Sequence, residues 1–530
     1  MSVTQFCDSQ THFGMLELAL GLVAIVLVLA YFYFTSTFNY WRDKGVVFVK
    51  PYPLVGSMWR QITLQEHMND FFRRIYFQYT DQPYVGFYQG PVPTLLVRDA
   101  DLIKNILVKD FSHFTDHGLK ISEKADPLMY MNLFHLRGQK WKDMRAKFAP
   151  TFTSGRLKSM FPLVLECANT FESHVGKLAD AANDVELKDL FGCFTTNVIA
   201  SNIFGISCDS FNEPNNTFRQ MSRKLMDTDF IQGINVALIF FIPGMSDLIK
   251  VALFKQECEV YFRNLMKDVM NFRSKTGETR NDFVQLLIEL MDKGFLSDKD
   301  NDDSEINSDV NAGYKKIEKL TENEAMAQAF VFFFAGFETS SLSMAYALFE
   351  LARRPDLQKT ARQHILEVLQ RHDNQITYEA LQDMTYLDWI LQETLRKYPT
   401  LAIFRECTKN YIIPGTKLKI EKGTALIIPN SGLHYDSQYF PDPEEFIPER
   451  FSDEEMVKRN QYVYLPFGEG PRLCIGKKLA NMQSKVGLLS ILHKFEVRSN
   501  PKTKYPLAWD ARRFLLTSKQ DVIVNISRIQ

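Results

Sequence analysis

The chain has 530 residues, of which 45% are hydrophobic and 13% aromatic, so it can bury a large core. Its formal net charge of −1 argues against nucleic acid as a partner. The cysteines, at positions 7, 167, 193, 208, 258, 407 and 474, are odd in number and form no C-x-x-C pair. This spacing argues against a disulfide framework or a zinc site, and it indicates a reducing compartment.

An apolar run near the N-terminus predicts a membrane anchor. Residues 18–34 carry no charge, and with the apolar residues just before Glu17 the run reaches the length of about 20 residues that a helix needs to cross a bilayer. Basic residues at 42, 44 and 50 follow it, which places the C-terminal bulk in the cytoplasm. A cleaved signal peptide is the alternative, but it would need basic residues before the run and a small-residue cleavage site after it. We therefore expect an anchor over residues 1–40, with a transmembrane helix at about 15–34.

A proline-rich hinge is expected to follow the anchor over residues 41–57, because Pro51 and Pro53 fix the backbone and block a helix. Residues 84–88 and 94–97 are rich in β-forming side chains and predict a hairpin. From about residue 99 to residue 371 the pattern is mostly helical.

Two segments interrupt the helical pattern. Residues 231–253 are strongly apolar but are broken by Pro243, and either burial in the core or contact with the bilayer surface would explain them. Residues 297–308 are dense in Asp, Asn and Ser and read as a solvated loop. Directly afterwards, Thr321 and Glu324 have the spacing of a capping box that opens an apolar helix ending at about Arg353.

Beyond Pro399 the sequence predicts strands and proline-rich loops, then one helix from about Gly476 and strands over 513–529. No internal repeat or linker divides residues 58–530. We predict a single cytosolic domain there, mainly α with a smaller β portion.

A glycine-rich loop around Cys474 carries the strongest chemical signal. Gly470 and Gly476 leave backbone N–H groups that can point at the sulfur, while apolar neighbours keep it dry. A shielded thiolate of this kind suits a haem iron as an axial ligand. A lone free cysteine is more commonly a small buried hydrophobe. The spacing Phe-x-x-Gly-x-Arg-x-Cys-x-Gly favours the ligand, and it is met by Phe467, Gly470, Arg472, Cys474 and Gly476.

This loop resembles the signature of the cytochrome P450 family, the haem-thiolate monooxygenases. The resemblance implies the P450 fold with an N-terminal transmembrane anchor helix, haem b as cofactor and Cys474 as ligand of the haem iron. Four motifs follow the family's order and cover nearly the whole chain. Residues 150–158 and 332–340 resemble the animal microsomal branch, and the residues at 398, 399, 405–408 and 414–416 most resemble insect detoxification enzymes.

Inside the apolar helix lies a second motif, Ala335-Gly336-Phe337-Glu338-Thr339-Ser340. Ala335 and Gly336 leave the helix face almost without bulk, so that a flat cofactor and a diatomic ligand can approach it. The Thr339 hydroxyl can bond the carbonyl four residues back, and Glu338 supplies a titratable group. A close helix crossing would explain the glycine equally well. The segment resembles the family's oxygen-activation motif, which makes Thr339 and Glu338 the candidate catalytic residues.

Further motifs are assigned through the same resemblance. Glu393 and Arg396, three residues apart on one helix, resemble the Glu-x-x-Arg motif, with Arg450 as their partner. We expect these three to brace the Cys474 loop in a structural role. Four residues are expected to bind the haem propionates: Trp141, Arg145, Arg405 and Arg472. Phe467, Ala335 and Gly336 are expected to contact the cofactor.

The resemblance implies insertion of one oxygen atom from O₂ into small apolar substrates, such as plant toxins, insecticides or endogenous lipids. The electrons would come from NADPH through a separate cytochrome P450 reductase, with cytochrome b5 as a second candidate donor, at the endoplasmic reticulum membrane. A docking patch is expected from Lys140, Lys142, Arg145, Lys147, Lys477 and Lys478. The substrate pocket is expected to use residues 115–134, 330–334, 401–404 and 514–516. Two alternatives are a haem-thiolate isomerase or dehydratase and a non-catalytic protein that binds haem or an apolar ligand.

Overall fold

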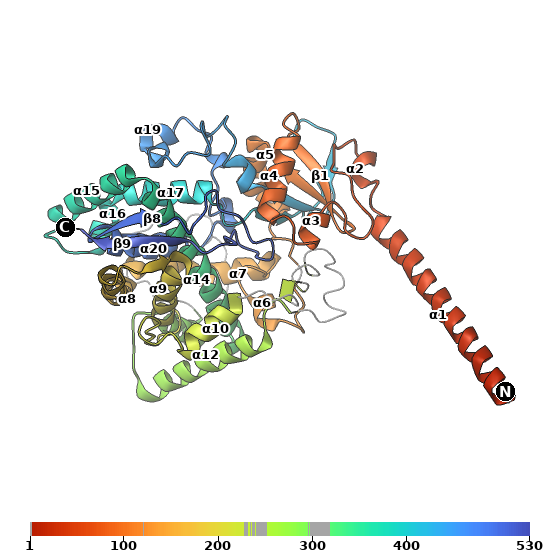
Figure 1. Cartoon of the computed structure of the whole chain (residues 1–530), viewed down its shortest axis with the longest axis horizontal. Coiled ribbons are helices and arrows are strands. Elements are labelled where there is room, and N and C mark those ends of the chain that lie inside the picture. Colours follow the sequence, from red (N-terminus) through yellow and green to blue (C-terminus); the bar gives the residue numbers. More distant parts are fainter. Residues whose placement is uncertain are drawn as a thin grey trace.

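The computed structural model describes residues 3–119, 121–226, 252–294 and 319–529, together with 232, 233, 235, 239 and 296; for residues 3–15 it describes the backbone only. The loop expected at 297–308 lies outside the described residues, as does most of 231–253. Of that second segment, Ile239 is buried and lines the central cavity. Figure 1 shows the helix α1 (Val3–Thr35) projecting from a body of helices with smaller sheets.

The central element of the body is α14 (Glu322–Arg353). It begins where the capping box predicted, because the Thr321 hydroxyl accepts the Glu324 N–H and the Glu324 carboxylate accepts the Thr321 N–H. The helix packs most extensively against four others and is buried over most of its length, as its apolar sequence predicts. These four are α6 (Pro127–Met131), α9 (Leu187–Asn202), α17 (Thr385–Lys397) and α20 (Lys477–Leu492).

The other helices complete the α-rich part. They are α2 (Tyr40–Asp43), α3 (Trp59–Ile62), α4 (Met68–Gln78), α5 (Ala100–Lys104), α7 (Gly138–Phe148), α8 (Ser154–Asp180), α10 (Thr217–Met226), α12 (Gln256–Thr276), α13 (Phe283–Lys293), α15 (Pro355–Arg371), α16 (Tyr378–Asp383), α18 (Asn430–Leu433) and α19 (Asp453–Met456). Single 3₁₀ or π turns lie at Asn105–Lys109, Phe111–His113, Ala149–Phe152, Pro448–Phe451, Gln461–Val463 and Gly470–Arg472.

The largest sheet has the order β1-β2-β7-β4, formed by β1 (Tyr84–Gln89), β2 (Val92–Val97), β7 (Ala425–Ile428) and β4 (Ile403–Glu406). The predicted hairpin is confirmed, since β1 pairs antiparallel with β2 and Tyr84 lies opposite Val97. β7 then runs parallel to β2 and antiparallel to β4. Residues of the β4 strand line the central cavity, so this sheet positions one side of the site.

A second sheet joins β3 (Asp184–Glu186), β9 (Ile523–Arg528) and β8 (Phe495–Ser499), and a third pairs β5 (Tyr411–Ile412) with β6 (Lys419–Ile420). The expectation of strands throughout 513–529 was wrong for residues 513–522. They form a loop, because Tyr346 of α14 holds it on the core: the Tyr346 hydroxyl donates to the Leu516 carbonyl at 3.0 Å and accepts the Ser518 N–H at 2.9 Å.

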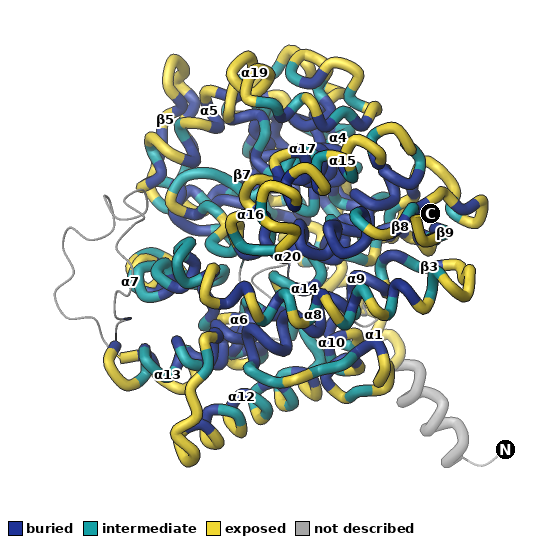
Figure 2. Tube along the Cα trace, turned by 90° about the vertical axis from the view of Figure 1, so that its left-hand side faces the viewer, coloured by how far each residue is buried: buried dark blue, intermediate teal, exposed yellow. Residues whose placement is uncertain are grey.

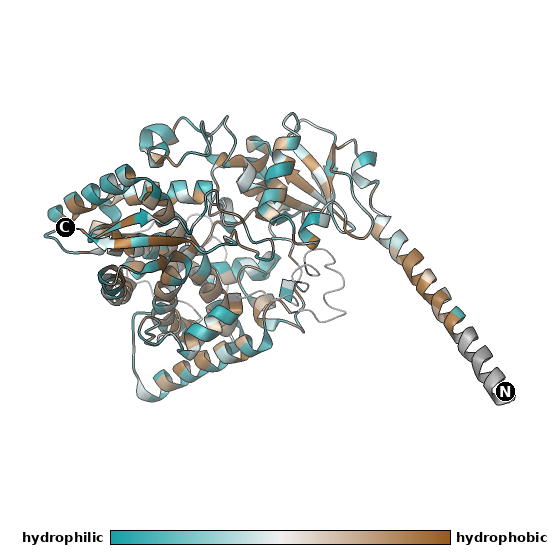
Figure 3. Ribbon diagram, in the orientation of Figure 1, coloured by the Kyte–Doolittle hydropathy of each residue, from teal (hydrophilic) through white to brown (hydrophobic). Residues whose placement is uncertain are grey.

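The core surrounds α14, and the exposed side chains lie on the outer turns of the body (Figure 2). Figure 3 shows that the coloured part of α1 is mainly hydrophobic outside the body. Residues 16–43 include an 18-residue stretch with the hydropathy of a membrane span, none of which is buried, and this makes α1 a candidate anchor. α14 is also long and apolar enough to cross a membrane, but it is mostly buried, which identifies it as a core helix.

The chain joins the body within the segment expected to be a hinge. The Trp41 side chain is fully buried, and its indole N–H donates to the Phe87 carbonyl at 3.2 Å. A Cβ on Gly86 would lie 2.5 Å from the Trp41 ring, so the glycine makes room for the indole. The Val49 N–H donates to the Gly86 carbonyl at 2.8 Å. Packing against β1 is already present at Phe38, just before this segment, where the Phe38 and Tyr88 ring centroids lie 5.2 Å apart, and Trp41 extends it.

Candidate active site

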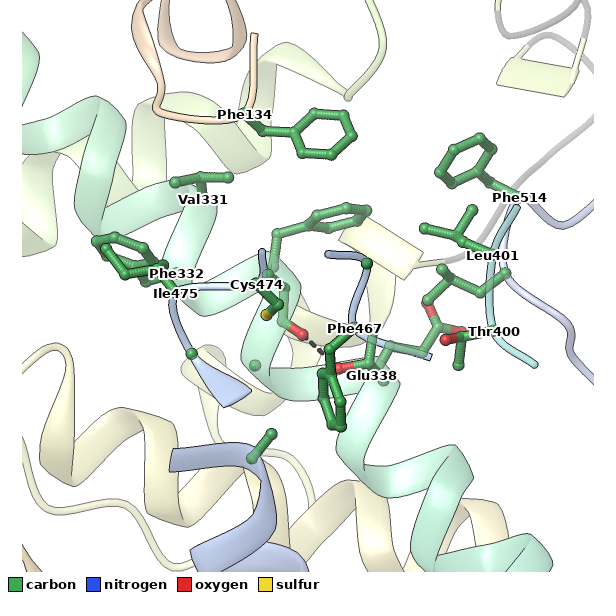
Figure 4. Close-up of a pocket in the computed structure, with 18 of the residues that line it drawn as sticks. Phe134, Val331, Phe332, Glu338, Thr400, Leu401, Phe467, Cys474, Ile475 and Phe514 are labelled. Carbon is green, nitrogen blue, oxygen red and sulfur yellow. Dashed lines mark hydrogen bonds between the residues drawn. The ribbon is translucent and has the colours of Figure 1, made fainter. Parts of the chain in front are cut away.

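A cavity of about 430 Å³ lies in the centre of the body, bounded by α14, α6, α7, the Cys474 loop and the start of β4 (Figure 4). All four segments expected to form the pocket contribute lining residues. These include His117, Leu119, Ile121, Met129, Leu133 and Phe134, then Val331, Phe332 and Phe334, then Leu401 to Phe404, and finally Phe514 and Leu515. Phe330 and Phe333 turn away into the core. The lining is mainly apolar, which suits an apolar ligand.

Cys474 faces this cavity and is labelled in Figure 4. The loop is closed by hydrogen bonds from the Cys474 N–H to the Phe467 carbonyl and from the Leu473 N–H to the Gly470 carbonyl, both at 2.9 Å. Desolvation raises the pKa of the Cys474 thiol, while the Gly476 N–H and the Arg145 and Lys477 charges lower it. A bound metal ion would supply the charge needed to hold the thiolate.

The two glycines of the loop have different roles. The Gly476 N–H does point at the Cys474 sulfur, as predicted. Gly470 does not, because its N–H donates to the Glu469 carboxylate at 3.0 Å. Its φ is +72°, and a Cβ there would lie 1.9 Å from the Leu107 carbonyl oxygen. Gly470 is required for close backbone packing.

The α14 motif lines the opposite side of the cavity. Ala335 is exposed to it, and the Thr339 hydroxyl donates to the Ala335 carbonyl at 2.6 Å, as predicted. Glu338 also lines the cavity and is labelled in Figure 4. Gly336 borders the cavity, but a Cβ there would lie 2.9 Å from Ile199 Cδ1 on α9. The helix-crossing explanation therefore holds for Gly336, and Ala335 provides the accessible face.

The four residues expected to bind propionates come together on the cavity wall: Trp141, Arg145, Arg405 and Arg472. Arg472 lies 4.0 Å over the Trp141 ring and donates to the carbonyls of Thr115 and Leu136 at 2.9 and 2.7 Å. Arg405 is buried and donates to the Phe404 carbonyl at 2.8 Å, but its Nε has no hydrogen-bond partner among the described residues. These groups are held in place mainly by backbone carbonyls.

The wall therefore carries an excess of buried positive charge. Burial lowers the pKa of Arg405 to about 10 and, together with Arg405 itself, lowers the pKa of Arg472 to about 8. Burial also lowers the pKa of Arg145. Among the described residues, these three guanidinium groups form a single ion pair, between Arg472 and Asp116 at 3.7 Å. The site therefore has fewer anions than cations, and a ligand with two carboxylates would balance the charge.

Two histidines on this wall were not predicted. His117 and His135 line the cavity, and His117 stacks on Phe134 with 4.2 Å between ring centroids. Burial and the Arg472 charge lower the pKa of His135 to about 3 and hold that of His117 well below its usual value, so both are neutral. No motif spacing marks them, because their position beside Arg472 arises only on folding.

Glu393, Arg396 and Arg450 form the expected network. Glu393 and Arg396 are fully buried and pair through two hydrogen bonds of 2.7 and 2.8 Å, while Arg450 Nε lies 3.4 Å from Glu393. Arg396 also donates to the His434 carbonyl at 2.9 Å, and the His434 ring accepts the Leu465 N–H at 3.2 Å. This chain of bonds reaches the residue before Pro466, where the Cys474 loop begins.

The comparisons with known proteins agree with this geometry. The family profile described as Cytochrome P450 matches residues 48–524. The chain belongs to the cytochrome P450 family. Membership gives it the P450 fold and makes it a haem monooxygenase. The thiol, the anion-deficient wall and the flat apolar face at Ala335 all fit the haem that this family implies.

Several insect cytochromes P450 are similar to this P450 over almost their full length. Cytochrome P450 6j1 of Blattella germanica is 36% identical over 520 residues, covering 98% of this chain and 99% of the relative. Cytochrome P450 6a2 of Drosophila melanogaster is 38% identical over 518 residues, covering 96% and 99%. Cytochrome P450 6B1 of Papilio polyxenes is 35% identical over 513 residues, covering 96% and 99%.

Proposed function

We propose that this P450 inserts one oxygen atom from O₂ into small apolar substrates, using electrons from NADPH delivered by a separate reductase. The observation that carries the proposal is the placement of Cys474 on an apolar cavity whose wall holds Arg145, Arg405 and Arg472, with one ion pair to a carboxylate among the described residues. Haem b, when bound, supplies the oxygen-activation chemistry, to which a thiolate ligand contributes electron density.

The haem would be held from two sides. Cys474 would ligate the iron through its thiolate, with the Gly476 N–H stabilising the negative charge. Arg145, Arg405, Arg472 and the Trp141 indole N–H would bind the propionates, which would restore the neutrality that the buried wall lacks. Phe467 and the Ala335–Gly336 face would contact the macrocycle. Glu393, Arg396 and Arg450 would keep the loop in place from behind.

Thr339 and Glu338 would take part in proton transfer on the substrate side of the haem. Because the Thr339 hydroxyl hydrogen is engaged by the Ala335 carbonyl at 2.6 Å, its oxygen remains available to accept a hydrogen bond in the cavity. Glu338 places a carboxyl group next to it on the same lining. Such a pair can orient a water molecule and relay protons to the reacting centre.

The substrates would be small apolar molecules. Phe134 and Phe514 present aromatic rings to the cavity from two loops that are far apart in sequence (Figure 4). Aromatic walls bury flat or branched hydrocarbon skeletons well. Xenobiotics such as plant toxins or insecticides, or endogenous lipids, have this character, and the similarity to insect P450s supports the first group.

The reductase would dock on the side of Cys474. Lys140 and Lys142 on α7 and Lys477 at the start of α20 are exposed. Lys478 donates to the Ser154 hydroxyl at 2.9 Å, which brings the start of α20 close to the segment that follows α7. A cationic surface here would attract an acidic donor face with a salt-dependent rate, and cytochrome b5 is a second candidate donor. α1 would anchor the enzyme in the endoplasmic reticulum membrane with the body in the cytosol.

The carbon monoxide difference spectrum of the reduced protein tests the proposal. Thiolate-ligated haem gives a long-wavelength Soret band, and we expect Cys474→Ser to abolish it. Cys167→Ser is the matched control, because Cys167 lies outside the cavity, and it should keep the band. Substrate-stimulated NADPH consumption with added reductase then tests turnover. A folded wild-type protein without the long-wavelength band would refute the haem-thiolate assignment, and a band without NADPH consumption would refute the monooxygenase cycle.

A further inference from the structure

Two walls of the cavity that are far apart in sequence meet at one buried carboxylate. The first wall is α6, from which Met129 lines the cavity, and the second comprises Leu253 and Phe254 just before α12. Asp126 is 3% exposed and lies at the N-cap of α6. Its Oδ1 accepts the Met129 N–H at 3.2 Å, and its Oδ2 accepts the Leu253 N–H at 3.1 Å.

The other end of α6 is attached to α14 by a side chain that does not ionise. Gln328 is fully buried; its Oε1 accepts the Leu133 N–H at 2.8 Å and its Nε2 donates to the Met131 carbonyl at 2.9 Å. α6 is therefore held at its C-terminal end by Gln328 and at its N-terminal end by Asp126.

The bond to Leu253 also places an aromatic wall. Phe254 packs edge-on against Phe334 and Phe330, with 4.8 and 5.5 Å between ring centroids. Phe334 itself lines the cavity. One oxygen of the Asp126 carboxylate therefore bonds the α6 wall and the other bonds the segment that carries the aromatic cluster. The distance between the two walls depends on both bonds. An asparagine could not replace both bonds, because its NH₂ group would face one of the two N–H donors.

We propose that Asp126 is a positioning residue that sets the affinity of this P450 for bulky apolar ligands by fixing the separation of these two walls. The proposal rests on the proposed function, since it concerns the same cavity. Asp126 does not line the cavity and would act through Met129, Leu253 and Phe254.

The binding of two azoles of different size distinguishes a change in the cavity walls from a change at the haem. Clotrimazole is bulky and must contact the cavity walls, whereas imidazole is small. Both are followed by the Soret shift of the full-length ferric enzyme at one pH. The variant is Asp126→Asn, and Asp99→Asn is the matched control. Asp99 is also an N-cap, accepting the Leu102 N–H at 2.7 Å, but it caps α5, which does not line the cavity.

We expect Asp126→Asn to raise the Kd for clotrimazole about tenfold, the equivalent of one buried hydrogen bond, with the Kd for imidazole and the carbon monoxide band unchanged. Asp99→Asn should change neither constant. A second variant, Asp126→Ser, keeps a good helix cap without reaching Leu253 and should behave like Asp126→Asn.

An unchanged Kd for clotrimazole would overturn the inference, and so would equal changes for the two azoles. If both Asp126 variants fail to fold while Asp99→Asn folds, Asp126 is a folding residue and the inference is also wrong. A wild-type enzyme without the long-wavelength carbon monoxide band would instead refute the proposed function, so the two failures remain distinct.

Discussion

Each glycine of the Cys474 loop has its own physical reason. Gly468 and Gly470 both have positive φ, at +75° and +72°. A Cβ at Gly468 would meet nothing within 4 Å, whereas one at Gly470 would collide with the Leu107 carbonyl. Both glycines therefore have a left-handed backbone conformation. Only Gly470 also lies against another part of the backbone, whereas Gly468 faces open space.

These two glycines give a matched pair of variants. We expect Gly468→Ala to cost about 1 kcal/mol of stability, the cost of a left-handed backbone for a residue with a Cβ. Gly470→Ala adds a collision with backbone, so the loop must move away from Leu107. Haem content and the height of the long-wavelength carbon monoxide band measure the outcome. Gly470→Ala should lose most of the band and Gly468→Ala should keep it; equal losses would contradict the role of Leu107.

The residues expected to bind propionates could be predicted one by one from the sequence. Trp141, Arg145, Arg405 and Arg472 were predicted from motif positions, and the structure brings all four to one wall. That the three arginines share a single carboxylate partner, Asp116, among the described residues could not be predicted, because it depends on which carboxylates the fold leaves nearby.

At the scale of elements, the crossing of α9 and α14 explains the glycine in the motif of residues 335–340. The two helices approach closely, and Ile199 fills the space where Gly336 would carry a Cβ. Glycine inside a helix costs about 1 kcal/mol relative to alanine, so the close crossing must compensate. Gln483 of α20 adds a hydrogen bond of 2.9 Å to the Gly336 carbonyl, which joins a third helix at this point.

A double-mutant cycle tests this explanation. Gly336→Ala alone should lower stability by about 1–3 kcal/mol, because its Cβ would overpack against Ile199 Cδ1. Ile199→Val removes that one atom, so in its background Gly336→Ala should become neutral or stabilising through its better helix propensity. Thermal unfolding of the four proteins gives the coupling free energy. Additive effects would mean that Gly336 is needed for another reason, such as approach of the cofactor.

At the scale of the whole molecule, the apolar α1 and the packed body meet near residue 40. Helix α1 is exposed along its described side chains, whereas Trp41 is fully buried against the first sheet. Removal of α1 should therefore leave the body intact only if Trp41 is retained.

Two truncations test this boundary. A chain beginning at residue 36 should keep the unfolding temperature and the carbon monoxide band of the full chain and should lose its binding to phospholipid vesicles. A chain beginning at residue 44 also loses Trp41 and should be less stable by about 3–5 kcal/mol, the usual cost of removing a buried tryptophan. Vesicle sedimentation and thermal unfolding are the measurements. Equal stability of the two truncations would show that Trp41 contributes nothing to the body.

The sequence by itself determined the features that depend on local order along the chain: the apolar N-terminal helix, the capped helix α14, the hairpin β1–β2 and the motifs around Cys474, Thr339 and Glu393. These follow from hydrophobic pattern, capping and spacing, which are properties of neighbouring residues. Only the tertiary structure decided which side of Gly336 is crowded, why Gly470 is a glycine, that residues 513–522 form a loop, and that Asp126 joins two cavity walls. Each of these depends on a contact between residues distant in sequence, and such contacts leave no periodic signal.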